Sequence, residues 1–219
     1  MADRKGNRTP RSRRCGTRVP ELGHYIIVTD TEETEYNYLT GLRRALPSDL
    51  QRKLTIKVIR KIQTKHLLEK ALRVKSDSAQ YAELWIVFDK DEVNDYDRII
   101  EDAHRKGIRV GWSNPCIEIW FHAYLGEMPY SQNPDICCEQ FNNVFLRITG
   151  RRYEKSDSKI YETLCQIGDE TKAVELAKRI YHDHRDNGNC RPSDMNPATT
   201  LYALIDEIRC KCKKNNSKE

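Results

Sequence analysis

Residues 83–91 read Glu-Leu-Trp-Ile-Val-Phe-Asp-Lys-Asp, an apolar run of strand length that ends abruptly in two carboxylates. A short apolar run of this kind is typical of a strand that is buried on both faces, as in a parallel sheet. Three other segments also have strand character, and segments with helical spacing of apolar residues separate them. The predicted strands are 24–29, 54–59, 83–88 and 108–112.

Helices are expected between and after these strands, at 35–46, 65–75, 96–106 and 115–125. Strands that alternate with helices indicate βαβ units, and right-handed crossovers then give a mostly parallel sheet with helices on both faces. The functional crevice of such a sheet lies at the carboxyl ends of its strands. The sequence therefore predicts an α/β fold.

Beyond residue 135 the predicted elements are all helical, at 136–149, 159–167 and 172–184, followed by a loop at 186–195. Asn196 as N-cap and Pro197 in the first turn then predict a last helix. The expected organisation is a disordered basic tail (1–20), an α/β metal-binding domain (21–130), a helical region packed on it (131–212) and a disordered end (213–219).

The composition is that of a globular protein whose 219 residues can bury a sizeable core without disulfides. We see neither an apolar run long enough to span a bilayer nor a signal peptide, so a cytoplasmic protein without a membrane partner is expected. Its eight cysteines should then stay reduced. The alternative is a zinc site of His182, His184 and Cys190 with Cys210 or Cys212, whose spacing matches no common ligand pattern.

The basic charge is concentrated at the beginning of the chain. Residues 1–20 hold seven Arg/Lys against Asp3, a local +6, and because the whole chain carries +5 the rest sums to −1. A solvated tail is the ordinary interpretation, and attraction to phosphate is the functional one.

Acidic residues follow two of the predicted strands. Asp89 and Asp91 would leave the third strand together, and paired carboxylates are ligands that magnesium prefers. The first strand ends in a second acidic group, which also fits the first turn of a helix. This group consists of Asp30, Glu32, Glu33 and Glu35. Because the ends of these two strands should be close, the acids would repel one another unless a metal neutralises them.

Glu118 and His122 are four residues apart, so they share one face of the predicted helix 115–125, which Ser113 or Asn114 would cap. A structural ion pair is one interpretation of such a pair. Metal coordination or proton transfer near the strand ends is the other.

These segments resemble the RloB family of anti-phage abortive-infection proteins. The run 27–38 is similar to the family's "VTEG" opening with "TE" and "PNYF", 85–91 to its "VFDRD" strand, and 113–122 to its "SNPCFELWLLLH" helix. Tyr153 with Lys155, the segment 173–177 and the run 196–202 are similar to its "YKK", "A…AK" and "NPSTTVH" elements. The resemblance covers about residues 25–208, and the order and spacing of the motifs make it specific.

The resemblance implies a Toprim-type fold, in which a glutamate after the first strand serves acid/base chemistry and an Asp-x-Asp motif binds magnesium. This chain has Asp30 where the family shows that glutamate, and Thr31 where it shows glycine. Aspartate is shorter by one methylene, and threonine disfavours a positive φ. Either the site tolerates Asp30, or a neighbour such as Glu32 reaches in, or activity is weaker.

The expected function is metal-dependent phosphodiester hydrolysis. Magnesium, with manganese as an alternative, would be held by Asp89, Asp91 and Asp30. Catalytic roles fall to Asp30, Glu118 and His122, and nucleic-acid contacts are expected from Arg151, Arg152 and Lys155. The resemblance implies cleavage of RNA such as tRNA rather than DNA, and an ATPase partner protein. The rivals are a DNA endonuclease, a nucleic-acid-binding module with a weak or inactive site, and a phosphatase- or receiver-like domain. The phosphatase- or receiver-like domain is disfavoured because its key aspartate usually ends the first strand, whereas the Asp-Lys-Asp run here ends the third.

Overall fold

The computed structural model describes residues 23–77, 82–91 and 93–216, so the predicted tail 1–20 lies outside the described residues. A five-stranded sheet in the order β2-β1-β3-β4-β5 forms its centre. Four strands are parallel, and the short β5 is antiparallel to β4. The strands are β1 (Gly23–Thr29), β2 (Leu54–Ile59), β3 (Ala82–Asp89), β4 (Arg109–Asn114) and β5 (Ala198–Thr199). The predicted α/β fold with a mostly parallel sheet is confirmed.

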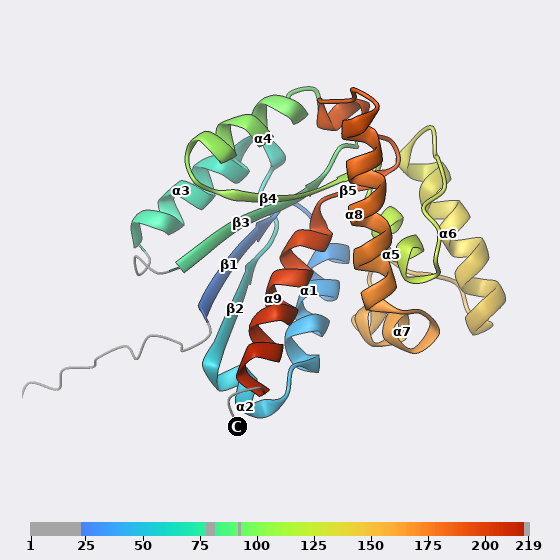
Figure 1. The fold of residues 1–219 in the computed structure, drawn as a ribbon, viewed down its shortest axis with the longest axis horizontal. Coiled ribbons are helices and arrows are strands. Elements are labelled where there is room, and N and C mark those ends of the chain that lie inside the picture. Colours follow the sequence, from blue (N-terminus) through green and yellow to red (C-terminus); the bar gives the residue numbers. More distant parts are fainter. Residues whose placement is uncertain (1–22, 78–81, 92, 217–219) are drawn as a thin grey trace, which may run out of the picture.

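Helices cover both faces of this sheet. Figure 1 shows α3 and α4 on one face, and α1 and α9 on the other, with α5 to α8 extending that second layer. The helices are α1 (Thr34–Ala45), α2 (Ser48–Lys53), α3 (Leu67–Asp77), α4 (Tyr96–Arg105), α5 (Glu118–Tyr124), α6 (Pro134–Thr149), α7 (Ile160–Ile167), α8 (Glu170–Asp186) and α9 (Leu201–Asn216). Short 3₁₀ turns lie at η1 (Thr64–His66) and η2 (Pro192–Asp194). The helical C-terminal region is also as predicted.

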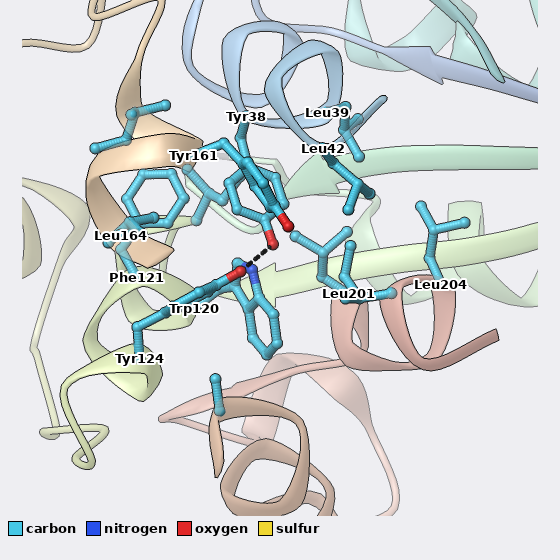
Figure 2. Close-up of a cluster of buried hydrophobic side chains, with 14 of the residues drawn as sticks. Tyr38, Leu39, Leu42, Trp120, Phe121, Tyr124, Tyr161, Leu164, Leu201 and Leu204 are labelled. Carbon is cyan, nitrogen blue, oxygen red and sulfur yellow. Dashed lines mark hydrogen bonds between the residues drawn. The ribbon is translucent and has the colours of Figure 1, made fainter. Parts of the chain in front are cut away.

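Successive side chains of each strand point to opposite faces of the sheet, so the interior is divided into two cores. In β3, Ile86 and Phe88 join the core under α3 and α4, whereas Trp85 and Val87 join the core under α1 and α9. In the second core the hydroxyls of Tyr38 (α1) and Tyr124 (α5) lie 2.8 Å apart (Figure 2). The C-terminal helices therefore share a core with the sheet.

Gly111 in β4 allows α9 to approach the sheet closely. A Cβ at this position would lie 3.3 Å from Cδ1 of Leu201, the first residue of α9. A larger residue would push α9 away from β4.

The last helix begins at Leu201 and not at Pro197, which corrects the sequence prediction. Residues 198–199 instead form β5, with Thr199 opposite Ser113 of β4. Oγ1 of Thr199 then accepts a hydrogen bond from the N–H of Leu201 at 3.1 Å. A two-residue strand is too short for hydrophobic alternation to predict it.

The helix predicted at 115–125 also begins later, at Glu118. Ser113 and Asn114 cannot cap it because they belong to β4, where they pair with β5. Pro115 therefore precedes the helix instead of occupying its first turn.

The end of the chain is helical for longer than expected. Helix α9 continues to Asn216, whereas the sequence predicted a disordered end from residue 213. Lys211 Nζ lies 2.5 Å from Oε1 of Glu83, and Cys212 is buried, so the last turns of α9 are attached to the body. Residues 217–219 lie outside the described residues. None of the helices in the described ranges is long and apolar enough to cross a bilayer.

Candidate functional site

A cavity of about 500 Å³ opens where β1 and β3 end. The two strands are neighbours and parallel, with Thr29 opposite Val87, so the residues that follow them meet at one edge of the sheet. Seven acidic residues line this cavity together with a single lysine, Lys155; two of them, Glu32 and Glu33, are exposed and precede α1. We call the other five the acidic cluster: Asp30, Glu35, Asp89, Asp91 and Glu118.

Asp30 directly follows β1 and points one carboxylate oxygen at the loop after β2. Its Oδ2 accepts a hydrogen bond from the hydroxyl of Thr64 at 2.7 Å. Its Oδ1 is buried and has no hydrogen-bond partner among the described residues. Burial raises the pKa of Asp30 to about 6, although the bond from Thr64 lowers it. The carboxyl can therefore change protonation close to neutral pH.

Glu35 belongs to the acidic cluster, but no separate role was predicted for it from the sequence. It lies in the first turn of α1 with no exposed surface, and its Oε2 accepts a hydrogen bond from Thr31. Its Oε1 is buried and unpaired among the described residues. Burial, and after it the charge of Asp30, raises the pKa of Glu35 to about 8. The available signal was its place in the acidic group that follows the first predicted strand.

Asp89 ends β3, and its carboxylate fixes the segment that leads into α5. Oδ2 accepts a hydrogen bond from the backbone N–H of Ile117 at 2.9 Å. Burial raises the pKa of Asp89 well above its usual range, and the charges of Glu35 and Glu118 raise it further. Asp89 is half-buried, and it lines the cavity together with residues 116–118.

Asp91 is exposed at the rim of the cavity and has φ of 30°, which is unusual for a residue with a side chain. Its backbone N–H bonds to the carbonyl of Pro115 at 3.2 Å. Strained backbone of this kind is common at functional sites, where the surrounding structure holds it. Asp91 therefore stands at the mouth of the cavity, and Asp89 lies deeper.

Glu118 is buried in the first turn of α5. Its Oε1 accepts hydrogen bonds from the hydroxyl of Tyr153 at 2.9 Å and from the thiol of Cys138 at 3.7 Å. Burial raises the pKa of the Cys138 thiol to about 12, so this thiol stays protonated and can donate. Two donors from the C-terminal region thus hold Glu118 at the cavity.

His122 does not line the cavity. It is buried one turn further along α5, and its ring lies edge-on to that of Phe141 at 5.5 Å between centroids. Burial lowers the pKa of His122, although Glu127 and Glu118 act in the opposite direction. The structure therefore places this predicted catalytic residue in the core, behind Glu118.

Of the three predicted nucleic-acid contacts, only Lys155 lines the cavity. Its partial burial acts to lower its pKa, but Glu118 and other nearby groups raise it by more, so it stays charged. Arg151 lies 2.9 Å from Asp157 and over the ring of Phe145. Arg152 is exposed and lies outside the cavity lining.

The thiols give no support to a zinc site. The seven cysteines within the described residues are all free. The ring of His184 is within hydrogen-bonding distance of the carbonyl of Pro197 and the amide of Asn189. Over the described residues, no three His, Cys, Asp or Glu side chains are already close enough together to hold one cation.

A protein-family model for the RloB-like proteins matches residues 25–208. The chain belongs to the RloB-like protein family. No curated protein and no solved structure matches it.

The RloB-like match contains the whole acidic cluster and Lys155. The structure also shows the surroundings of Asp30 and Thr31, the two residues that depart from the family motif. Positive φ at non-glycine residues occurs, within the described ranges, at Lys61 and Asp91, so Thr31 occupies its position without that strain. Glu32, which the sequence analysis considered as a substitute, is exposed and paired with Lys61 at 2.9 Å. The buried acid beside Asp30 is Glu35.

The cluster of this RloB-like protein presents carboxylate oxygens, which are the type of ligand that divalent cations prefer. Carboxylate oxygens are hard ligands, and two of them, Oδ1 of Asp30 and Oε1 of Glu35, are buried without partners in the described structure. Burial first, and the like charge of neighbouring carboxylates after it, oppose ionisation within the cluster and raise the pKa values of Asp30, Glu35 and Asp89. Since the side chains are not yet close enough to share one ion, a cation would have to draw them together.

Proposed function

We propose that this RloB-like protein hydrolyses phosphodiester bonds in a reaction that needs a divalent cation. The observation that carries the proposal is the acidic cluster, five carboxylates around one cavity at the carboxyl edge of a parallel sheet. A purely structural arrangement would not keep so many acids together, because burying unpaired like charges costs free energy. A bound cation offsets that cost.

Asp89 and Asp91 would hold magnesium, or manganese in its place, with Asp30 and Glu35 completing the oxygen ligands. Such a cation, when bound, polarises the phosphate and lowers the pKa of a water molecule. In the alternative in which Asp30 does not bind the cation, it is suited to accept a proton, because burial raises its pKa to about 6 in the metal-free protein. Lys155, charged and at the cavity wall, would bind a phosphate oxygen.

Glu118 and His122 have different roles in this proposal. Glu118 faces the cavity and would orient the ligands around it, held by Tyr153. His122 does not line the cavity and its ring nitrogens have no hydrogen-bond partner among the described residues, so it would act only indirectly, through the packing of α5 against Phe141.

The substrate class rests on the family resemblance alone. The resemblance favours RNA such as tRNA over DNA as the substrate. It also implies a role in anti-phage abortive infection and an ATPase partner protein. A cytoplasmic location fits these expectations.

The test is cleavage of total RNA and of plasmid DNA by the full chain with magnesium, manganese or EDTA. We expect cleavage that requires the cation and is lost in the double variant Asp89→Asn/Asp91→Asn. Asp183→Asn, an exposed acid on α8, serves as the matched control and should cut normally. Wild-type cleavage by the double variant would refute the hydrolytic assignment.

A second candidate function is nucleic-acid binding without cleavage, which the replacement of the family's glutamate by Asp30 favours. The same assay distinguishes hydrolysis from binding without cleavage. A wild-type chain that binds RNA tightly but cuts neither substrate with either cation is a binding module.

A further inference from the structure

A second charged surface borders the cavity on the side of β2. It is formed by the loop after β2 and by the first turns of α3, and it carries five basic residues and one acid, Glu69. We call these residues the basic surface: Arg60, Lys61, Lys65, Lys70 and Arg73.

The loop that carries this surface is attached directly to the acidic cavity. Thr64 lines the cavity and donates its hydroxyl to Asp30 at 2.7 Å. The backbone N–H of Lys61 bonds to the carbonyl of Thr31 at 3.3 Å. A ligand that reaches the acidic cluster on this side therefore lies next to the basic surface.

A groove of about 250 Å³ continues from the loop along α3. Lys61, Lys70 and Arg73 line it, together with His66. Lys65 is exposed between Thr64, which faces the acidic cavity, and His66, which faces the groove. The basic side chains thus form a row that extends from the cavity along the loop after β2 and α3.

Most of the positive charge on this path is available to a ligand. Lys61 pairs with Glu32, and Arg73 is 4.0 Å from Glu69, but both pairs are exposed and so contribute little. Lys65 and Lys70 form no ion pair with any residue in the described ranges. Five cations against Glu69 leave a local excess that attracts polyanions.

The cavity itself cannot supply the affinity for a polyanion. The seven carboxylates that line it outnumber Lys155, and Arg151, which was expected to contact nucleic acid, is paired with Asp157. Phosphates on either side of the reacting one must therefore be held by another part of the molecule.

We propose that the basic surface binds the backbone phosphates of the nucleic-acid strand next to the phosphate that enters the acidic cavity. This inference rests on the proposed function for its substrate class, and it adds the side on which the strand leaves the site. Lys65 would contact the phosphate closest to the cavity, and Lys70 one further along the groove.

The test is equilibrium binding of a short fluorescein-labelled single-stranded RNA of mixed sequence, and of the DNA of the same sequence, to the full chain. EDTA is present so that no cleavage occurs. The double variant Lys65→Gln/Lys70→Gln is compared with Lys178→Gln/Arg179→Gln, which removes the same charge from exposed positions on α8, on the other face of the sheet. Thermal unfolding verifies that both variants are folded.

We expect the Lys65/Lys70 variant to bind more weakly than the control. The slope of log affinity against log salt should become shallower by about 1.4, because each lost contact with a single strand removes about 0.7. An affinity and slope equal to those of the control would overturn the proposal, as would a wild-type chain that binds neither probe. Because binding is measured without cleavage, the result is independent of whether Asp89 and Asp91 support hydrolysis.

Discussion

The hydroxyl of Tyr153 donates a hydrogen bond to Oε1 of Glu118 over 2.9 Å, and both side chains are buried. Tyr153 follows α6, whereas Glu118 begins α5, so this bond joins the helical C-terminal region to the wall of the acidic cavity. The site is therefore shaped by both halves of the chain.

Replacing Tyr153 by phenylalanine should destabilise the protein without changing its shape. Glu118 would lose its hydroxyl donor while staying buried, which costs about 1–3 kcal/mol of the free energy of unfolding. Urea denaturation measures this cost, and Tyr130→Phe, at an exposed tyrosine, should leave the stability unchanged. Equal stability of the two variants would show that the bond does not hold Glu118.

Glu35, and not Glu32, should be required for cation-dependent cleavage. Glu35→Gln removes a buried carboxyl group that would complete the oxygen ligands beside Asp30, and we expect activity to fall by about tenfold to 100-fold, as for other groups that support metal sites. Glu32→Gln, at an exposed acid that pairs with Lys61, should keep nearly full activity. Cleavage rates at saturating substrate compare the two variants, and the reverse order would place Glu32 in the site.

The metal-free protein should lose stability as the pH rises from about 5 to about 8. The folded-state pKa values of Asp30 (about 6) and Glu35 (about 8) are raised above their unfolded values, so the folded state binds more protons in this range. The free energy of unfolding therefore falls as these carboxyls ionise in the folded protein.

Urea denaturation in EDTA at several pH values measures this slope. Glu35→Gln should make the slope shallower, because glutamine does not titrate, and magnesium should raise stability most at the alkaline end. A metal-free protein whose stability rises across the same range would contradict the assigned protonation of the cluster.

The basic segment at the start of the chain should contribute affinity but not chemistry. Residues 1–20 carry a local +6, whereas every acid assigned to catalysis follows them. A chain that starts at Glu21 should bind RNA more weakly, with a shallower salt dependence, and cut at nearly the same rate at saturation. Normal binding combined with lost cleavage would place the segment in the active site.

The sequence alone determined the α/β fold and the place of most acids. Apolar runs at 24–29 and 83–88 have the length and composition of buried strands, and in a parallel sheet the residues that follow neighbouring strands must meet. Asp30, Asp89 and Asp91 could therefore be assigned to one edge, and the structure brings all three to one cavity.

Only the tertiary structure decided which neighbouring side chains complete that cavity. Glu32 and Glu35 look alike in sequence and both line the cavity, but Glu32 precedes α1 and is exposed, whereas Glu35 lies in the first turn of α1 and is buried. His122 shares a helix face with Glu118, yet the packing of α6 encloses it, and β5 appears only because β4 offers a free edge. Local spacing cannot predict these outcomes, because they depend on contacts between segments far apart in the chain.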